Sequence, residues 1–174
     1  MRRVVFLDRD GVLTIPVEAN GRGYAPRTID DFELYPDAGA SVELLKAAGF
    51  DVVVVTNQPD IGAGLVEPGI VDEMHALLVS AVAVDRVRVC PHVTQDACSC
   101  RKPAPGLLLA EAGDFDIDLP ASWMVGDRDS DLAAGAALGV RTVFIARGWH
   151  GETGLGADVV AHNLAEAVAA ILSA

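Results

Sequence analysis

Two groups of aspartates follow short hydrophobic segments that have the composition of buried strands. Asp8 and Asp10 come directly after residues 4–7, and a second group begins at Asp127 and ends at Asp131. Carboxylates at two strand ends can share one hard cation such as Mg²⁺. Aspartates also occur in ordinary turns and in calcium-binding EF-hand loops. The EF-hand needs an acidic residue at its twelfth position, where these two segments have alanine and leucine, so a shared Mg²⁺ site is favoured.

Side chains suited to phosphate lie between these two groups. Thr56, Asn57 and Gln58 follow four consecutive valines, and their hydroxyl and amide groups can hydrogen-bond to phosphate and sugar oxygens. Arg101 and Lys102 form the densest basic spot near the middle of a chain with only two lysines and a net charge of −12. Positive charge among carboxylates fits a small anionic substrate held together with a cation.

All three cysteines fall in one short segment. Cys90, His92, Cys98 and Cys100 form the pattern C-x-H-x5-C-x-C, which supplies three thiolates and one imidazole, a full tetrahedral set for Zn²⁺. Because protein atoms fill every position, we expect this zinc to be structural. The alternative is three free thiols and a surface histidine, and an odd cysteine count argues against a disulfide framework. Zinc bound in the loop 90–100 would order the basic pair that follows it.

The elements that must position these groups alternate between strands and helices. Apolar runs predict strands over 4–7, 51–56, 87–90, 122–125, 141–146 and 158–161. Helical spacing with Pro and Gly at the boundaries predicts helices over 37–49, 68–84, 105–112, 129–138 and 164–172. The alternation predicts an α/β fold, a parallel sheet with helices on both faces, in one domain spanning 1–174. Ligands of such sheets bind beyond the carboxyl ends of the strands.

Composition and charge exclude several classes of protein. With 51% hydrophobic residues the chain is too apolar for disorder, and no uncharged run reaches the ~18 residues of a membrane span. The net charge of −12 argues against a nucleic-acid partner and against an anionic membrane surface. The first apolar run, residues 4–7, is too short for a signal peptide, which predicts a cytoplasmic protein.

Two further features have less specific interpretations. Residues 14–36 lack clear periodicity and are rich in Gly, Pro and Asn, so we expect a flap over the site. His75 lies within the predicted helix 68–84 and is interpreted as structural or solvated.

The order of the polar groups resembles the four motifs of phosphatases of the haloacid dehalogenase (HAD) superfamily. The matching residues are Asp8-x-Asp10, Thr56-Asn57, Lys102, and Asp127 with Asp131. The resemblance covers essentially the whole chain. It implies a three-layer Rossmann-like fold without a large cap domain, and a Mg²⁺-dependent hydrolase of phosphomonoesters that forms an aspartyl-phosphate.

The resemblance also implies a role for each matching residue. Asp8 is the expected nucleophile, and Asp10 is expected to protonate the leaving oxygen and later to activate water. Mg²⁺ is expected to bind Asp8, the backbone carbonyl of Asp10, and Asp127, while Thr56 and Lys102 hold the phosphoryl group. The physical logic agrees, because a carboxylate attacking an anionic phosphate needs nearby positive charge.

The remaining predicted substrate-binding residues are Arg9, Gly11, Asn57, Gln58 and Arg101. Arg9 and Arg128 each lie between two aspartates, where positive charge fits a small anionic substrate, and the alternative is that they only neutralise the neighbouring carboxylates. Asp131 is expected either to bind the metal through water or to orient the lysine.

Within the superfamily, the zinc loop resembles two groups of enzymes. These are the D-glycero-D-manno-heptose 1,7-bisphosphate 7-phosphatases and the histidinol-phosphate phosphatases. The segments 101–109, 121–127 and 142–148 favour the heptose group, whereas the five residues between His92 and Cys98 match the histidinol-phosphate group. An arginine common after Gln58 in the heptose group is missing here, and Arg101 or Arg147 could compensate for it.

The sequence favours the heptose bisphosphate, with histidinol phosphate or another small phosphorylated metabolite as alternatives. The resemblance suggests a monomer. A nucleic-acid end-processing phosphatase fits less well, because the sequence has no basic stripe. A non-catalytic zinc module also fits less well, because Asp8 and Asp10 are both present.

Overall fold

A six-stranded parallel sheet forms the centre of the computed structural model, which describes all 174 residues. Its strands are β1 (Arg3–Leu7), β6 (Phe50–Asn57), β7 (Arg86–Cys90), β8 (Trp123–Gly126), β9 (Arg141–Ile145) and β10 (Val159–Ala161). They lie in the order β10-β9-β8-β1-β6-β7, and each neighbouring pair is parallel. All six predicted strands are therefore found, and no boundary differs by more than one residue.

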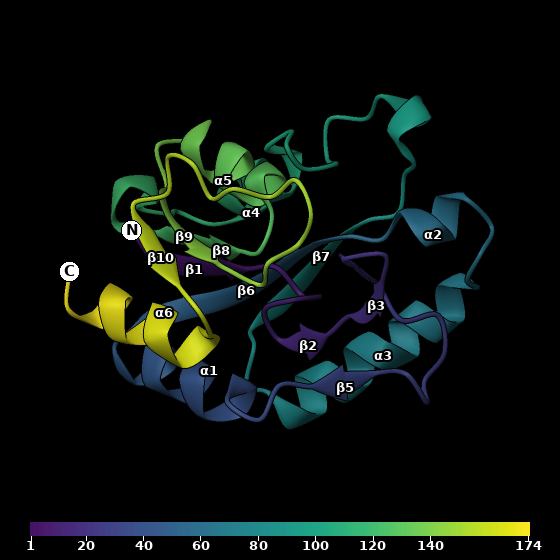
Figure 1. Cartoon of the computed structure of the whole chain (residues 1–174). Coiled ribbons are helices and arrows are strands. Elements are labelled where there is room, and N and C mark those ends of the chain that lie inside the picture. The colour runs from purple at the N-terminus through teal and green to yellow at the C-terminus, as the bar shows by residue number, and fades with distance from the viewer.

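Helices cover both faces of this sheet (Figure 1). One layer holds α1 (Ala38–Ala47), α3 (Pro68–Ala81) and α6 (Leu164–Leu172), and the other holds α4 (Gly106–Asp114) and α5 (Asp129–Ala136). The predicted three-layer α/β fold is confirmed. No helix has both the length and the apolar character needed to cross a membrane.

Alternating side chains of the central strands fill two separate cores. In β1, Val5 and Leu7 pack with α1, α3 and α6, whereas Val4 and Phe6 pack with α4 and α5. The valines 52–55 of β6 divide between the two cores in the same way. A strand that is buried on both faces needs a continuous apolar run, which is why four consecutive valines predicted this strand so well.

The strand order reverses between β1 and β8. From β1 the chain builds β6 and β7 on one side and then crosses to start β8 on the other side of β1. Parallel sheets of this order bind ligands in the crevice at the reversal. The backbone N–H of Asp8 donates to the carbonyl of Val125 at 3.0 Å, so the first aspartate group lies beside the strand that carries the second.

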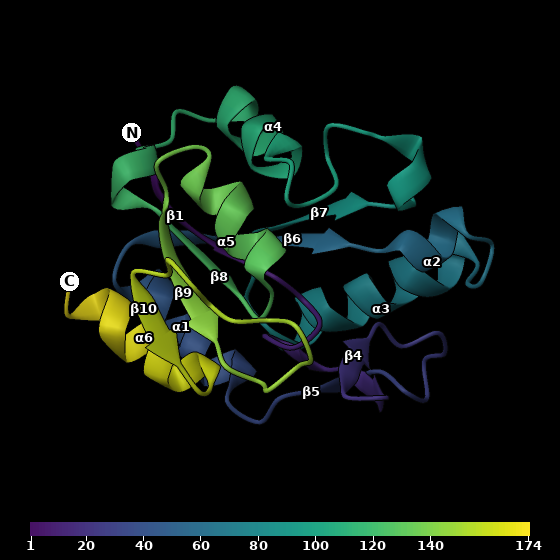
Figure 2. The ribbon, with the colours of Figure 1, turned by 45° about the horizontal axis from the view of Figure 1, so that its top comes forward.

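Residues 8–37 contain short elements that the sequence did not resolve. The antiparallel pairs are β2 (Thr14–Ile15) with β5 (Glu33–Leu34), and β3 (Val17–Ala19) with β4 (Arg22–Tyr24). Strands of two or three residues are too short to show a period of two. Single turns also form at α2 (Pro59–Gly62), η1 (Thr94–Asp96) and η2 (Leu119–Ala121). In Figure 2 the carboxyl ends of β6 and β7 lie on the side of the molecule away from both termini.

Candidate active site and metal-binding clusters

Three buried carboxylates and one buried lysine meet at the reversal of strand order. Asp8, Asp127 and Asp131 each offer an oxygen, and these oxygens lie within 4.8 Å of one another. The Nζ of Lys102 is 2.9 Å from Asp8 Oδ1 and 2.6 Å from Asp131 Oδ1, and it donates to the Val55 carbonyl at 2.7 Å. This arrangement agrees with the expectation that Asp131 orients the lysine.

The cluster has more negative than positive charge. Burial raises the pKa of Asp8 to about 6, although the Lys102 ammonium opposes the change. Burial, followed by the charges of Asp8 and Asp131, also raises the pKa of Asp127. Burial alone would lower the pKa of Lys102, but the carboxylates outweigh burial and hold that pKa above its usual range.

The donor set fits a hard divalent cation. Asp127 Oδ1 is buried and has no hydrogen-bond partner in the protein, and an orphaned carboxylate oxygen of this kind is rare. A cation bound between Asp8 and Asp127 would satisfy this oxygen and offset the excess negative charge. Oxygen ligands of this type are those that Mg²⁺ prefers.

Two glycines allow the loops of the site to approach each other. Gly11 has a positive φ of 91°, and a Cβ placed on it would lie 1.9 Å from Asp127 Oδ2. A Cβ on Gly126 would lie 2.2 Å from the Cβ of Asp131. No side chain can be accommodated at such distances, so glycine is required at both positions. Gly11 therefore shapes the site through its backbone.

The carboxylate of Asp10 is held by four donors. Arg9 donates from Nε to Oδ1 at 3.0 Å and from Nη2 to Oδ2 at 2.9 Å. Thr14 Oγ1 donates to Oδ1 at 3.0 Å, and Gln58 Nε2 donates to Oδ2 at 2.8 Å and to Thr56 Oγ1 at 2.8 Å. Arg9 is 0% exposed, which differs from the expectation that it contacts phosphate. The interpretation that it neutralises a neighbouring carboxylate describes its contacts better.

Asn57 supports the lysine from the neighbouring strand end. Its Nδ2 donates to the Lys102 carbonyl, and its Oδ1 accepts from the Lys102 backbone N–H, both at 3.1 Å. This reciprocal pair fixes the backbone of the residue that carries the ammonium. Sequence reasoning predicted Asn57 as a substrate contact, and the structure gives its amide a supporting contact as well.

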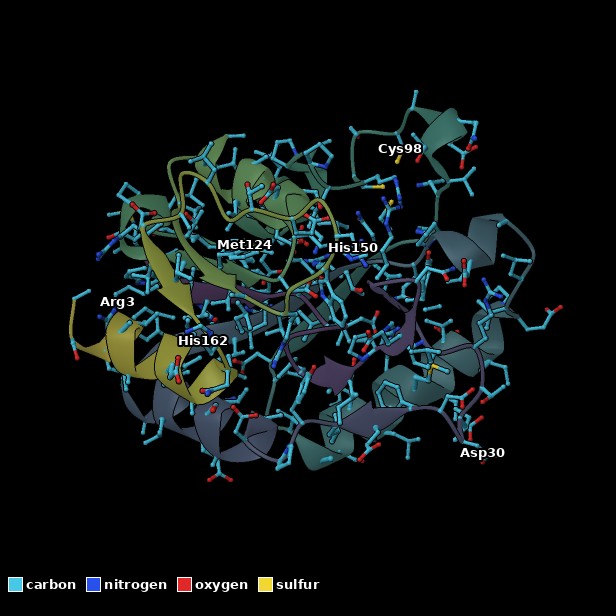
Figure 3. All side chains as sticks on the ribbon, in the orientation of Figure 1. Arg3, Asp30, Cys98, Met124, His150 and His162 are labelled. Carbon is cyan, nitrogen blue, oxygen red and sulfur yellow. The ribbon has the colours of Figure 1, made fainter.

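The four predicted zinc ligands come together in the loop after β7. The three Sγ atoms are 3.1–3.7 Å apart, and His92 Nδ1 is 3.2 Å from Cys100 Sγ and 3.6 Å from Cys90 Sγ. Thiolates in a tetrahedral zinc site, with Zn–S bonds of ~2.3 Å, are separated by about 3.8 Å. The donor set therefore fits zinc. Figure 3 shows Cys98 in the loop at the outer edge of the molecule.

A cavity of about 610 Å³ opens over the carboxylate cluster. Of the residues predicted for catalysis and phosphate binding, it is lined by Asp8, Asp10, Asn57, Arg101 and Lys102, and of the predicted zinc ligands by Cys98. Arg9, Gly11, Thr56, Gln58 and Asp127 are not among its lining residues. The predicted phosphate-binding residues therefore divide into a set that faces the cavity and a set that lies behind its wall.

Two cavity arginines lie outside the predicted set of substrate-binding residues: no sequence pattern indicated Arg22, and Arg128 stood out only as a positive charge between two aspartates. Arg22 and Tyr24 of the β3–β4 pair and Arg128 before α5 line the cavity together with Arg101. Arg147, which the sequence suggested for a substrate phosphate, instead stacks on Tyr35 and donates to the Gly11 carbonyl at 2.8 Å. A single arginine in a loop has no pattern that predicts its direction.

The loop between β9 and β10 adds a residue that the sequence did not indicate. Trp149 Nε1 donates to Asp127 Oδ2 at 2.5 Å. The backbone N–H of His150, labelled in Figure 3, donates to the Gly21 carbonyl at 2.9 Å. The loop thus contacts both a carboxylate of the cluster and the β3–β4 pair.

Comparison with known proteins agrees with this geometry. A model of the HAD-hydrolase-like family matches residues 99–167. The D-glycero-beta-D-manno-heptose-1,7-bisphosphate 7-phosphatase of Pseudomonas putida is 35% identical over 151 residues, which cover 84% of this chain and 83% of that protein. This chain belongs to the HAD phosphatases. The resemblance predicted from the four motifs is therefore confirmed.

Two more proteins are similar to this HAD phosphatase. The histidine biosynthesis bifunctional protein HisB of Blochmanniella floridana is 28% identical over 146 residues, which cover 81% of this chain and 40% of HisB. The crystal structure of D,D-heptose 1,7-bisphosphate phosphatase from B. bronchiseptica, complexed with magnesium and phosphate, has a TM-score of 0.80 and 29% identity. That comparison covers 98% of each chain.

Proposed function

We propose that this phosphatase removes the 7-phosphate of D-glycero-D-manno-heptose 1,7-bisphosphate. The observation that carries the proposal is the 35% identity, over more than four fifths of both chains, to an enzyme of that name. The cavity supports it, because its lining includes the buried Asp8, Asp131 and Lys102 as well as three arginines. The coarser conclusion, a HAD phosphatase for a small phosphorylated metabolite, follows from the family.

The first step is transfer of the phosphoryl group to Asp8. Its carboxylate attacks phosphorus and the bond to the sugar oxygen breaks, which leaves an aspartyl-phosphate. The Nζ of Lys102 lies 2.9 Å from the attacking carboxylate and stabilises the charge on the transferring oxygens. Mg²⁺, held by Asp8, the carbonyl of Asp10 and Asp127, supplies further positive charge when bound.

Asp10 serves as acid and then as base in this proposal. It lines the same cavity as Asp8 and can give a proton to the departing sugar oxygen. In the second step it takes a proton from water, which attacks the aspartyl-phosphate and regenerates Asp8. Four donors hold its carboxylate, so its direction is set before the substrate arrives.

The cavity arginines are suited to the second phosphate of a bisphosphate. Arg22, Arg101 and Arg128 reach the cavity from three different segments, and guanidinium groups bind phosphate through paired donors. They offer an alternative to the arginine missing after Gln58. We assign structural Zn²⁺ to the loop 90–100, where it orders Arg101. A monomeric state and a cytoplasmic location stay predictions from the sequence.

Histidinol phosphate is the second candidate substrate. The similarity to HisB and the five-residue spacing within the zinc loop favour it. Phosphate release with Mg²⁺ should be compared for the heptose bisphosphate and histidinol phosphate at equal concentrations. A higher kcat/KM for the heptose supports the proposal, and a higher value for histidinol phosphate replaces it with the second candidate.

Matched variants sharpen this comparison. Arg22→Ala and Arg128→Gln should raise KM for the bisphosphate at least ~10-fold and leave kcat/KM for a monophosphate within about threefold. Arg27→Ala is the control, because Arg27 is a surface arginine paired with Asp60 and does not line this cavity. Equal effects on both substrates would contradict a second phosphate site at these arginines.

A further inference from the structure

Arg9 connects the active site to a buried histidine on a helix. Its Nη1 lies 3.0 Å from Nε2 of His75, on α3, while Nε and Nη2 hold the Asp10 carboxylate. The guanidinium also lies over the ring of Phe32, with 5.8 Å between Cζ and the ring centroid. Arg9 is 0% exposed and His75 is 8% exposed, so solvent cannot readily replace either contact.

The chemistry of this contact requires one form of the histidine. Arginine carries only donors and stays protonated in proteins, so Nε2 of His75 must accept the hydrogen bond from Nη1. The ring is then neutral and has its proton on Nδ1. Burial, together with the Arg9 charge, lowers the pKa of His75 to about 4, which agrees with a neutral ring near pH 7.

We propose that His75 is a positioning residue for Asp10 and acts through Arg9. This inference rests on the proposed role of Asp10 as acid and base. Without an acceptor at position 75, one buried N–H of Arg9 has no partner, which is unfavourable because water cannot replace the lost hydrogen bond. The guanidinium then shifts toward another acceptor, and the two bonds that aim Asp10 at the cavity lose their alignment.

The test uses the leaving group of the substrate. An alkyl phosphate releases a sugar oxygen that needs a proton, whereas p-nitrophenyl phosphate releases a stable phenolate that does not. The parameter kcat/KM reports the step that forms the aspartyl-phosphate. General acid catalysis contributes typically 10²–10⁴-fold, so His75→Leu should lower kcat/KM for an alkyl phosphate ~10–100-fold and for p-nitrophenyl phosphate less than about threefold.

Two further variants separate positioning from folding. His75→Gln keeps an acceptor oxygen and should restore most of the alkyl phosphate activity. Met74→Leu changes a neighbouring buried residue of α3 with little change in volume, and should leave both substrates near wild type. Thermal unfolding by circular dichroism compares the stability of all three variants.

The outcomes distinguish this inference from the proposed function. Asp10→Asn should show the same selective loss with alkyl phosphates. Suppose that Asp10→Asn lowers kcat/KM selectively for alkyl phosphates. If His75→Leu then shows no such selectivity, or if His75→Gln is no more active on alkyl phosphates than His75→Leu, only the role of His75 is overturned. If Asp10→Asn is not selective, both the acid role of Asp10 and the inference are overturned.

Discussion

Replacing the nucleophile Asp8 with asparagine should abolish phosphate release and stabilise the protein when Mg²⁺ is absent. Burial raises the pKa of Asp8 from 3.8 to about 6. The folded state therefore binds a proton more tightly than the unfolded state, so this group lowers the free energy of unfolding as pH rises from 3.8 to 6. Above pH 6 the free energy of unfolding is lowered by the full cost of burying the ionised Asp8 carboxylate.

The size of the effect follows from this shift. About two pKa units correspond to roughly 3 kcal/mol at pH 8. An asparagine avoids that cost, and the raised pKa already includes the opposing attraction between the Asp8 carboxylate and Lys102. The expected gain is therefore roughly 3 kcal/mol, which raises Tm by about 6–12 °C in a chain of this length.

The assay is thermal unfolding by circular dichroism at pH 8 and pH 5. The buffers contain neither Mg²⁺ nor a chelator, so that any zinc is retained. The advantage of Asp8→Asn over wild type should be about 1 kcal/mol smaller at pH 5, because the wild-type carboxyl is mostly protonated there. Added Mg²⁺ should raise Tm more in wild type than in the variant.

Asp10→Asn is the matched control. The substitution is the same, but hydrogen bonds stabilise the carboxylate of Asp10, whereas burial destabilises that of Asp8. Asp10 accepts two hydrogen bonds from buried Arg9, and weakening them should lower the free energy of unfolding by about 1–3 kcal/mol. The two variants are thus expected to change stability in opposite directions. An Asp8→Asn protein that is less stable than wild type at pH 8 without Mg²⁺ would refute the argument from burial.

Three further changes test other parts of the site. Lys102→Met should lower kcat by ~10²–10³-fold in a phosphate-release assay, because it removes positive charge from the transferring oxygens. Cys98→Ser should lower zinc content and Tm together, as measured by elemental analysis and thermal unfolding. Trp149→Phe should weaken Mg²⁺ binding ~10-fold in calorimetry, because Asp127 loses the donor that orients it.

Each of these expectations has a result that contradicts it. Wild-type kcat in Lys102→Met would remove the lysine from the chemistry. Stoichiometric zinc in Cys98→Ser would exclude that cysteine as a ligand. An unchanged dissociation constant for Mg²⁺ in Trp149→Phe would mean that the indole has no effect on the metal site. Leu155→Ala, at an exposed position in the loop of Trp149, is the control for that variant.

The sheet and its helices were predictable because their signals are local. A strand buried on both faces, such as β6, has to be a run of valines, and helices such as α5 begin directly after the polar residues of a strand end. The candidate cluster was predictable for a related reason. Strand ends gather at one edge of a parallel sheet, so Asp8 and Asp127 could be expected to meet before any distance was known. Lys102 lies in the loop between β7 and α4, and only the resemblance to the HAD motifs predicted that it joins them.

The side-chain directions were not predictable in this way. Arg9 was expected to contact phosphate. Its position between two aspartates does not determine whether the side chain points into the cavity or into the protein. In the structure it is buried and contacts His75 of α3. His75 and Trp149 contact the site from segments distant in sequence, and neither lies in a recognisable motif. Such contacts depend on how α3 and the loop after β9 dock on the sheet.

The separation between the strand-end cluster and the rim of the cavity has a consequence for divergence of the enzyme. Asp8 and Asp127 directly follow β1 and β8, which are packed between the two helical layers. The arginines that line the cavity come from the β3–β4 pair, from the residue after the zinc loop 90–100 and from the residue before α5. New specificities can therefore be selected in libraries restricted to these rim segments, because loops accept substitutions that packed strands do not.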